Sequence, residues 1–176
     1  MIVYFFRHAS AGKSLHDPKK DARRPLDEEG LLQARYMGRM LASLDVQIDH
    51  IVSSPLKRAL QTASLAANEL AYEAPIRLDE ALLPESGFDQ FRALIARLKK
   101  YDTIIVVGHN PSFTEFLSKT ISGSSGAAQI EFKKGAVAKV EMQGRGGILE
   151  WLVVPKIARV LQTSLKASSR PKTSRK

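Results

Sequence analysis

Cysteine is absent from the 176-residue chain. Its absence excludes a disulfide framework, a thiol nucleophile and any iron–sulfur or zinc site built on cysteine. A chain without cysteine is compatible with a reducing compartment. The strand-like start at residues 2–6 has neither a preceding basic segment nor the small-residue cleavage site of a signal peptide. We therefore expect a cytoplasmic protein.

Long apolar runs are also missing. None approaches the roughly 20 residues that cross a bilayer, because Arg7, Gly108 and Pro155 interrupt the strand-like segments. We expect no membrane partner. Apolar residues make up 44% of the chain and charged residues 26%, both ordinary for soluble globular proteins. The length suits one domain with a real core, which we place at residues 1–155.

Acidic residues are scarce near the C-terminus. The net charge is +9, and residues 156–176 carry seven basic residues and no acidic one, so the first 155 residues are nearly neutral at +2. A short apolar pattern after Pro155 predicts one amphipathic helix, and residues 168–176 have the composition of a disordered segment. No aromatic residue is interleaved with these charges, which favours a solubilising tail over attachment to nucleic acid, and attachment stays the alternative.

Strand-like and helix-like segments alternate through the body, which predicts an α/β fold with a largely parallel sheet. The expected strands are 2–6, 48–53, 76–78, 103–108 and an antiparallel hairpin of 136–142 with 148–154. The expected helices are 26–44, 55–70, 87–99 and 111–122.

Cationic and titratable side chains follow three of these strands. Arg7 and His8 end the first, Arg58 comes shortly after the second, and His109 follows the strand at 103–108. Ligands of open α/β sheets bind outside the carboxyl ends of the strands, so these four side chains can converge. Arginine binds phosphate oxygens in a bidentate manner, and a histidine among arginines can attack phosphorus. The sequence therefore predicts a phosphoryl-transfer site with His8 as nucleophile.

Three motifs resemble those of the histidine phosphatase superfamily. They are RHA at residues 7–9, SSPLKRALQT at 53–62 and VGHN at 107–110. The resemblance covers about residues 1–155. It implies a phosphoglycerate mutase-like, three-layer α/β/α sandwich with a phosphohistidine intermediate on His8. It further implies that Arg7, Arg58 and His109 hold the phosphoryl oxygens and that no metal or other cofactor takes part.

Within the superfamily, the chain is most similar to the SixA-type phosphohistidine phosphatases. The likeness lies in RPLDEEGLLQA at residues 24–34 and in a connection before Phe88 that is too short for a lid. The first of these makes Arg24 a candidate substrate ligand, with a solvated charge as the alternative. An open site admits a protein side chain, so the implied substrate is a phosphorylated protein such as a histidine phosphotransfer domain.

The group that protonates the leaving atom is left open by the sequence. Glu80, in LDE at residues 78–80, aligns with the acid of larger family members, and Glu85 is its nearby rival. A phosphoramidate needs less acid catalysis than an ester, because its leaving nitrogen has the higher proton affinity. Two alternatives therefore stand beside a phosphohistidine phosphatase: a small-molecule phosphomonoesterase, and a non-catalytic module that binds phosphate or nucleic acid.

Overall fold

The computed structural model describes residues 1–168, and thirteen elements follow one another along this part of the chain. The strands are β1 (Ile2–Arg7), β2 (His50–Ser53), β3 (Arg77–Leu78), β4 (Thr103–Gly108), β5 (Val137–Gln143) and β6 (Gly146–Val153). The helices are α1 (Pro18–Ala22), α2 (Glu28–Ser43), α3 (Lys57–Glu69), the 3-10 turn η1 (Glu80–Leu82), α4 (Phe88–Arg97), α5 (Ser112–Ser122) and α6 (Pro155–Ser168).

The six strands form one sheet in the order β3-β2-β4-β1-β5-β6. Strands β1 to β4 are mutually parallel, whereas β5 runs antiparallel to β1, and β6 antiparallel to β5. The largely parallel sheet with an antiparallel edge is thereby confirmed. Strands β1 and β4 are direct neighbours, and their register pairs Arg7 with Gly108 at the carboxyl ends.

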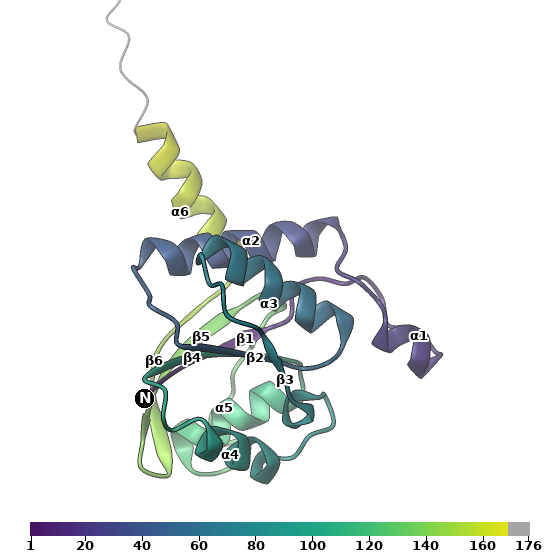
Figure 1. The fold of residues 1–176 in the computed structure, drawn as a ribbon, viewed down its shortest axis with the longest axis vertical. Helices are drawn as coiled ribbons and strands as arrows, with labels where there is room; N and C mark the ends of the chain where they lie inside the picture. The colour runs from purple at the N-terminus through teal and green to yellow at the C-terminus, as the bar shows by residue number, and fades with distance from the viewer. Residues whose placement is uncertain (169–176) are drawn as a thin grey trace, which may run out of the picture.

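Helices cover both faces of the sheet, which gives the expected three layers (Figure 1). Alternate residues of the central strands point to opposite faces, since side chains alternate along a strand. Val3 and Phe5 pack in the cluster that includes α4 and α5, whereas Tyr4 and Phe6 pack in the cluster that includes α2 and α3. Each of these four side chains is buried, so β1 lies in the middle of both cores.

The expected helices and strands are found close to their predicted places, with small differences. The hairpin strand β6 begins at Gly146, two residues earlier than its hydrophobic pattern indicated, because the turn is tight. Two short elements were not predicted: α1, which contains no buried residue, and the three-residue η1. Neither has the apolar periodicity by which longer elements are found.

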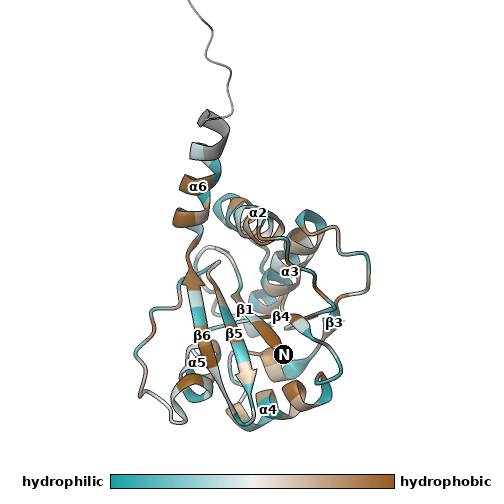
Figure 2. Ribbon diagram, turned by 90° about the vertical axis from the view of Figure 1, so that its left-hand side faces the viewer, coloured by the Kyte–Doolittle hydropathy of each residue, from teal (hydrophilic) through white to brown (hydrophobic). Residues whose placement is uncertain are grey.

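The helix expected after Pro155 is α6, which leaves the body beside α2 (Figures 1 and 2). Ala158 is fully buried, and the side-chain amide of Gln162 donates to the carbonyl of Tyr36 over 2.8 Å. Disorder is predicted for residues 168–176, and all of these except Ser168 lie outside the described part of the chain. The disordered end stays a prediction. No helix among the described residues has both the length and the apolar character needed to span a bilayer.

Candidate active site

The carboxyl ends of β1, β2 and β4 bring the predicted cationic residues to one place. His8 and His109 follow neighbouring strands, and their rings lie 4.8 Å apart between centroids. Arg58 reaches the same place from the first turn of α3. A cavity of about 640 Å³ opens there. Its lining consists of His8, Gly12, Lys13, Ser14, Asp21, Arg24, Arg58, Pro84, His109, Asn110 and Lys134.

Backbone hydrogen bonds fix the chain where it leaves the sheet. The His8 amide donates to the Gly108 carbonyl over 2.9 Å, which continues the β1–β4 ladder past the end of β1. The Ala9 amide then donates to Oγ1 of Thr62 over 3.1 Å, and that hydroxyl donates to the Arg58 carbonyl over 2.7 Å. The segment carrying His8 is therefore tied both to β4 and to the helix that carries Arg58.

His8 is held as a neutral imidazole with one defined tautomer. Its Nδ1 lies 2.8 Å from the carbonyl oxygen of Ala9, and a carbonyl can only accept, so Nδ1 carries the proton. The lone pair is left on Nε2, at the tip of the ring. Burial lowers the pKa of His8 to about 3, and the charges of Arg58 and Arg7 add to this effect. At neutral pH the ring is therefore uncharged, with its proton on Nδ1 and a free lone pair on Nε2, as a nucleophile requires.

His109 is the second neutral imidazole of the pocket. Its Nε2 lies 2.8 Å from Oγ of Ser54, the residue that follows β2. Burial lowers the pKa of His109 to about 2, with further contributions from His8 and Arg58. Its Nδ1 is buried without a hydrogen-bond partner among the described residues. A neutral ring beside His8 avoids placing a further positive charge against the two arginines.

The two arginines are only partly hydrogen-bonded, and Arg58 belongs to the described lining of this cavity whereas Arg7 does not. Arg7 donates from Nη1 to the Phe132 carbonyl over 2.5 Å, and Arg58 is 6% exposed. Burial lowers the pKa of both guanidinium groups, which nevertheless stay charged at neutral pH. The Nε atom of each is buried with no partner in the described part of the chain. Buried donors without acceptors are costly, and a phosphoryl group would bring the acceptors.

Asp21, which the sequence analysis did not single out, is the counter-ion of the pocket. Its Oδ2 lies 3.1 Å from Nη1 of Arg58, and its Oδ1 accepts from Nε of Arg24 over 2.8 Å and from the Leu15 amide over 2.9 Å. The Leu15 amide and the Arg24 side chain hold the pKa of Asp21 down at about 2. In the sequence, the one feature that could have pointed to Asp21 is its position three residues before Arg24.

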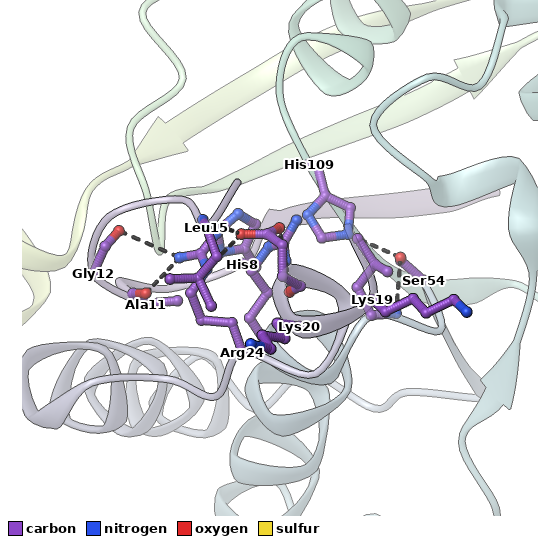
Figure 3. A network of polar contacts seen from close by, with 12 residues as sticks. His8, Ala11, Gly12, Leu15, Lys19, Lys20, Arg24, Ser54 and His109 are labelled. Atoms are coloured by element: carbon purple, nitrogen blue, oxygen red, sulfur yellow. Dashed lines mark hydrogen bonds and ion pairs between the residues drawn. The ribbon is translucent and has the colours of Figure 1, made fainter. Parts of the chain in front are cut away.

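Arg24, the candidate substrate ligand, lines the cavity, but most of its guanidinium is engaged within its own loop. Besides Asp21, it donates from Nη1 to the carbonyls of Ala11 and Gly12 (Figure 3). These bonds join the two ends of the loop of residues 11–24, which contains α1 and forms part of the lining of the pocket. A direct contact between Arg24 and a substrate stays a prediction.

Helix α2 packs against the start of that loop. Asp27, its N-cap residue, accepts from Oγ of Ser10 over 2.7 Å and from the Gly12 amide over 2.8 Å. Gly30 lies so close to the loop that a Cβ atom there would stand 1.9 Å from the carbonyl oxygen of Ser10. The helix and the loop are therefore in direct backbone contact.

Neither candidate acid lines the cavity among the described residues. Glu80 opens η1 with an exposed side chain, and only its carbonyl is used, as acceptor of Oγ of Ser86 over 2.6 Å. Glu85 is exposed too, although its charge reaches Arg58 and raises the pKa of that guanidinium slightly against burial. Asp21 is the one carboxylate in the described lining. Within residues 1–168, no group of three His, Asp or Glu side chains gathers as a metal site would.

The fold and this pocket together define an α/β protein with a site for a phosphoryl group. Residues 3–85 match the model of the histidine phosphatase superfamily, branch 1. A protein of Picosynechococcus sp. with no characterised function is 31% identical over 140 residues, which cover 78% of this chain and 82% of that protein. The phosphohistidine phosphatase SixA of Escherichia coli K12 is 25% identical over 158 residues, 88% of this chain and 94% of SixA.

A solved structure of the protein histidine phosphatase SixA with tungstate superposes with a TM-score of 0.79 at 23% identity. The match covers 89% of this chain and 99% of that one, so the fold is shared over nearly the whole described body. The chain belongs to the histidine phosphatase superfamily and is a phosphatase. The family predicted from the three short motifs is thereby confirmed.

Proposed function

We propose that this phosphatase removes the phosphoryl group from a histidine of another protein, through a phosphohistidine on His8. The observation that carries the proposal is the state of His8: its Nδ1 proton is committed to the Ala9 carbonyl, and its pKa of about 3 leaves Nε2 unprotonated. A histidine so arranged among arginines is equipped to attack phosphorus rather than to donate a proton.

The reaction then has two displacements at phosphorus. The Nε2 lone pair forms a bond to phosphorus while the bond to the substrate imidazole nitrogen breaks. That nitrogen keeps the bonding electron pair, and the imidazole leaves neutral with the proton that its other ring nitrogen already carried. Water next attacks the phosphorus on His8, the electron pair of the P–N bond returns to Nε2, and both protons of the water leave on the phosphate. Arg7 and Arg58 stabilise the oxygens in both steps, which is the main help a protein gives to a loose phosphoryl transition state. No metal is required by this scheme.

The acid-poor pocket supports a phosphoramidate as the substrate. Asp21 is the one carboxylate in the described lining, and a pKa of about 2 makes it a poor proton donor near neutral pH. An ester oxygen needs a proton as it leaves, whereas the leaving imidazole can arrive already protonated. The likeness to SixA, a phosphohistidine phosphatase by name, points the same way.

The open surroundings of the pocket support a protein as the carrier of that phosphohistidine. The connection from β3 to α4 contains only η1 and short turns, so no further element of that segment covers the site. Bulky substrates such as a histidine phosphotransfer domain can therefore approach the strand ends. We further propose that Arg24 contacts the substrate and that Glu80 is the general acid for ester substrates.

The test is to trap the intermediate. The protein is mixed with a radiolabelled phosphohistidine protein, quenched in alkali and analysed for acid-labile label on the enzyme. We expect label on wild type and on His50→Ala, whose ring stacks on Tyr101 at the far end of β2, and none on His8→Ala. Hydrolysis of p-nitrophenyl phosphate far faster than of the phosphoprotein would instead establish the phosphomonoesterase alternative.

A further inference from the structure

A second large cavity lies beside the cavity that His8, Arg58 and His109 line, which we call the phosphoryl pocket. It measures about 620 Å³ and is formed by α2, the segment before β5 and the start of α6. We call it the α2–α6 groove, and its lining is Arg7, Glu29, Leu32, Gln33, Tyr36, Glu131, Lys133, Lys134, Val154, Pro155, Lys156 and Arg159. Nothing in the proposed chemistry uses most of these residues.

The groove and the phosphoryl pocket share a border. Lys134 lines both cavities, and Arg7, which ends β1 next to His8, lines the groove. Gln33 lines the groove as well, and its Oε1 accepts from the amide of Ser10, two residues after His8, over 2.9 Å. The Gly135 amide donates to the His8 carbonyl over 3.1 Å, which fixes the segment before β5 beside the pocket. A protein bound at the pocket can therefore also contact the groove.

The groove is strongly cationic. Five basic and two acidic side chains line it, which leaves a surplus of three positive charges. One acid, Glu131, is paired with Lys133 over 3.4 Å. On α6, Lys156 and Arg159 are both exposed, and the structure records no ion pair for either among the described residues. Unbalanced charge of one sign in a cleft attracts a partner of the opposite sign.

Apolar surface accompanies the charge. Leu32 of α2 is 54% exposed at the groove, and Val154 and Pro155 contribute the wall where β6 passes into α6. A mixed lining of this kind matches a folded protein surface that carries both acids and apolar side chains. It suits a nucleic-acid backbone less well, because Glu29 and Glu131 would face its phosphates.

We propose that the α2–α6 groove docks an acidic segment of the phosphorylated protein substrate, adjacent to its phosphohistidine. The inference rests on the proposed function and names the surface by which the same site selects its partner. Docking through charge lowers KM and quickens association, while leaving the bond-breaking step to the phosphoryl pocket. The groove thereby separates recognition of the protein from recognition of the phosphoryl group.

The test compares a protein substrate with a small one. The double variant Lys156→Glu, Arg159→Glu reverses two exposed charges that lie outside the phosphoryl pocket. For a phosphohistidine phosphotransfer domain we expect KM to rise roughly tenfold or more, with kcat nearly unchanged. For free phosphohistidine, kcat/KM should stay within about twofold of wild type. The rise of KM with salt should also be weaker than in wild type.

A matched control is the double variant Lys99→Glu, Arg145→Glu. It makes the same change of net charge at exposed positions just before β4 and in the β5–β6 turn, at the amino ends of the parallel strands, opposite the end that bears the pocket. We expect wild-type KM for both substrates. An unchanged KM in the α6 variant, or an equal rise in the control, overturns the docking proposal while the proposed function stands. Failure of wild type to hydrolyse any phosphohistidine protein overturns the proposed function itself.

Discussion

The phosphoryl pocket has two halves that are held together differently. The half that bears His8 and His109 continues two paired strands and is fixed by backbone hydrogen bonds and strand register. The other half, residues 11–24, contributes residues such as Asp21 and Arg24 to the lining and is fixed by side chains, above all Asp21. The strand half carries the proposed reacting groups, and the loop half contacts Arg58 through Asp21. The two halves should therefore fail differently when they are altered.

Removing the nucleophile from the strand half should give the largest loss. In His8→Ala we expect phosphohistidine hydrolysis to fall by roughly 10³-fold or more, since no other group in the pocket can replace a covalent nucleophile. Steady-state assays with phosphoprotein measure the loss, and His50→Ala serves as the control. Retention of more than a tenth of the activity would mean that His8 is not the nucleophile.

Replacing Arg58 by lysine tests whether charge alone suffices at the junction of the halves. The variant keeps the charge but loses the planar fork, and we expect kcat/KM to fall about 10²-fold. Inhibition by inorganic phosphate should weaken in parallel, which can be measured as an inhibition constant. An activity close to wild type would show that Arg58 does not bind the phosphoryl group in a bidentate manner.

Breaking the loop half should have a moderate effect. Asp21→Asn removes the charge that orients Arg58 and Arg24, and we expect kcat/KM to fall roughly tenfold. The free energy of unfolding should fall by about 1 kcal/mol, because the hydrogen bonds of residues 11–24 weaken. Chemical denaturation and kinetics measure the two effects. A loss as large as that of His8→Ala would contradict the division of labour between the halves.

The pH dependence of stability sharpens the comparison further. The pKa values of His8 and His109 are lowered to about 3 and about 2 in the folded state, so between pH 6.5 and 3 the unfolded chain binds protons that the folded chain does not. The free energy of unfolding should therefore fall by up to about 1.4 kcal/mol per pH unit for each ring as the pH drops through this window.

Denaturation series from pH 7 to 4 measure this slope, and His8→Ala should reduce it. Asp21 contributes to this slope only below about pH 5, because its pKa is about 2 in the folded state and about 3.9 in the unfolded chain. A wild-type slope in His8→Ala would contradict the buried, neutral state of that ring.

The smallest effect is expected at Glu80. A general acid contributes roughly 10²–10⁴-fold, whereas we expect Glu80→Gln to change phosphohistidine hydrolysis by less than about twofold. The same variant assayed on p-nitrophenyl phosphate shows whether Glu80 serves esters. A large loss of phosphohistidine hydrolysis would show that Glu80 acts as a general acid in that reaction.

The two halves also differ in how far the sequence predicts them. Arg7 ends β1, and His8 and His109 directly follow β1 and β4. Parallel strands must bring their carboxyl ends together, so the convergence of these residues could be predicted. Asp21 lies in the short helix α1, whose position depends on partners distant in sequence, such as Arg58. Lys134 borders both cavities from a segment with no periodic pattern. Contacts of this kind come from tertiary structure, which local sequence patterns do not contain.

The contact between Gly30 and Ser10 determines how much of the structure must accompany the pocket if it is transferred to another protein. The backbone of α2 touches Ser10, at the start of the loop, with no room for a side chain, so the start of the loop and the helix pack as one unit. A designer who grafts this pocket onto a new scaffold must carry α2 with its glycine, and not only the residues that meet phosphate. A saturation library at residue 30 should accordingly return glycine almost alone.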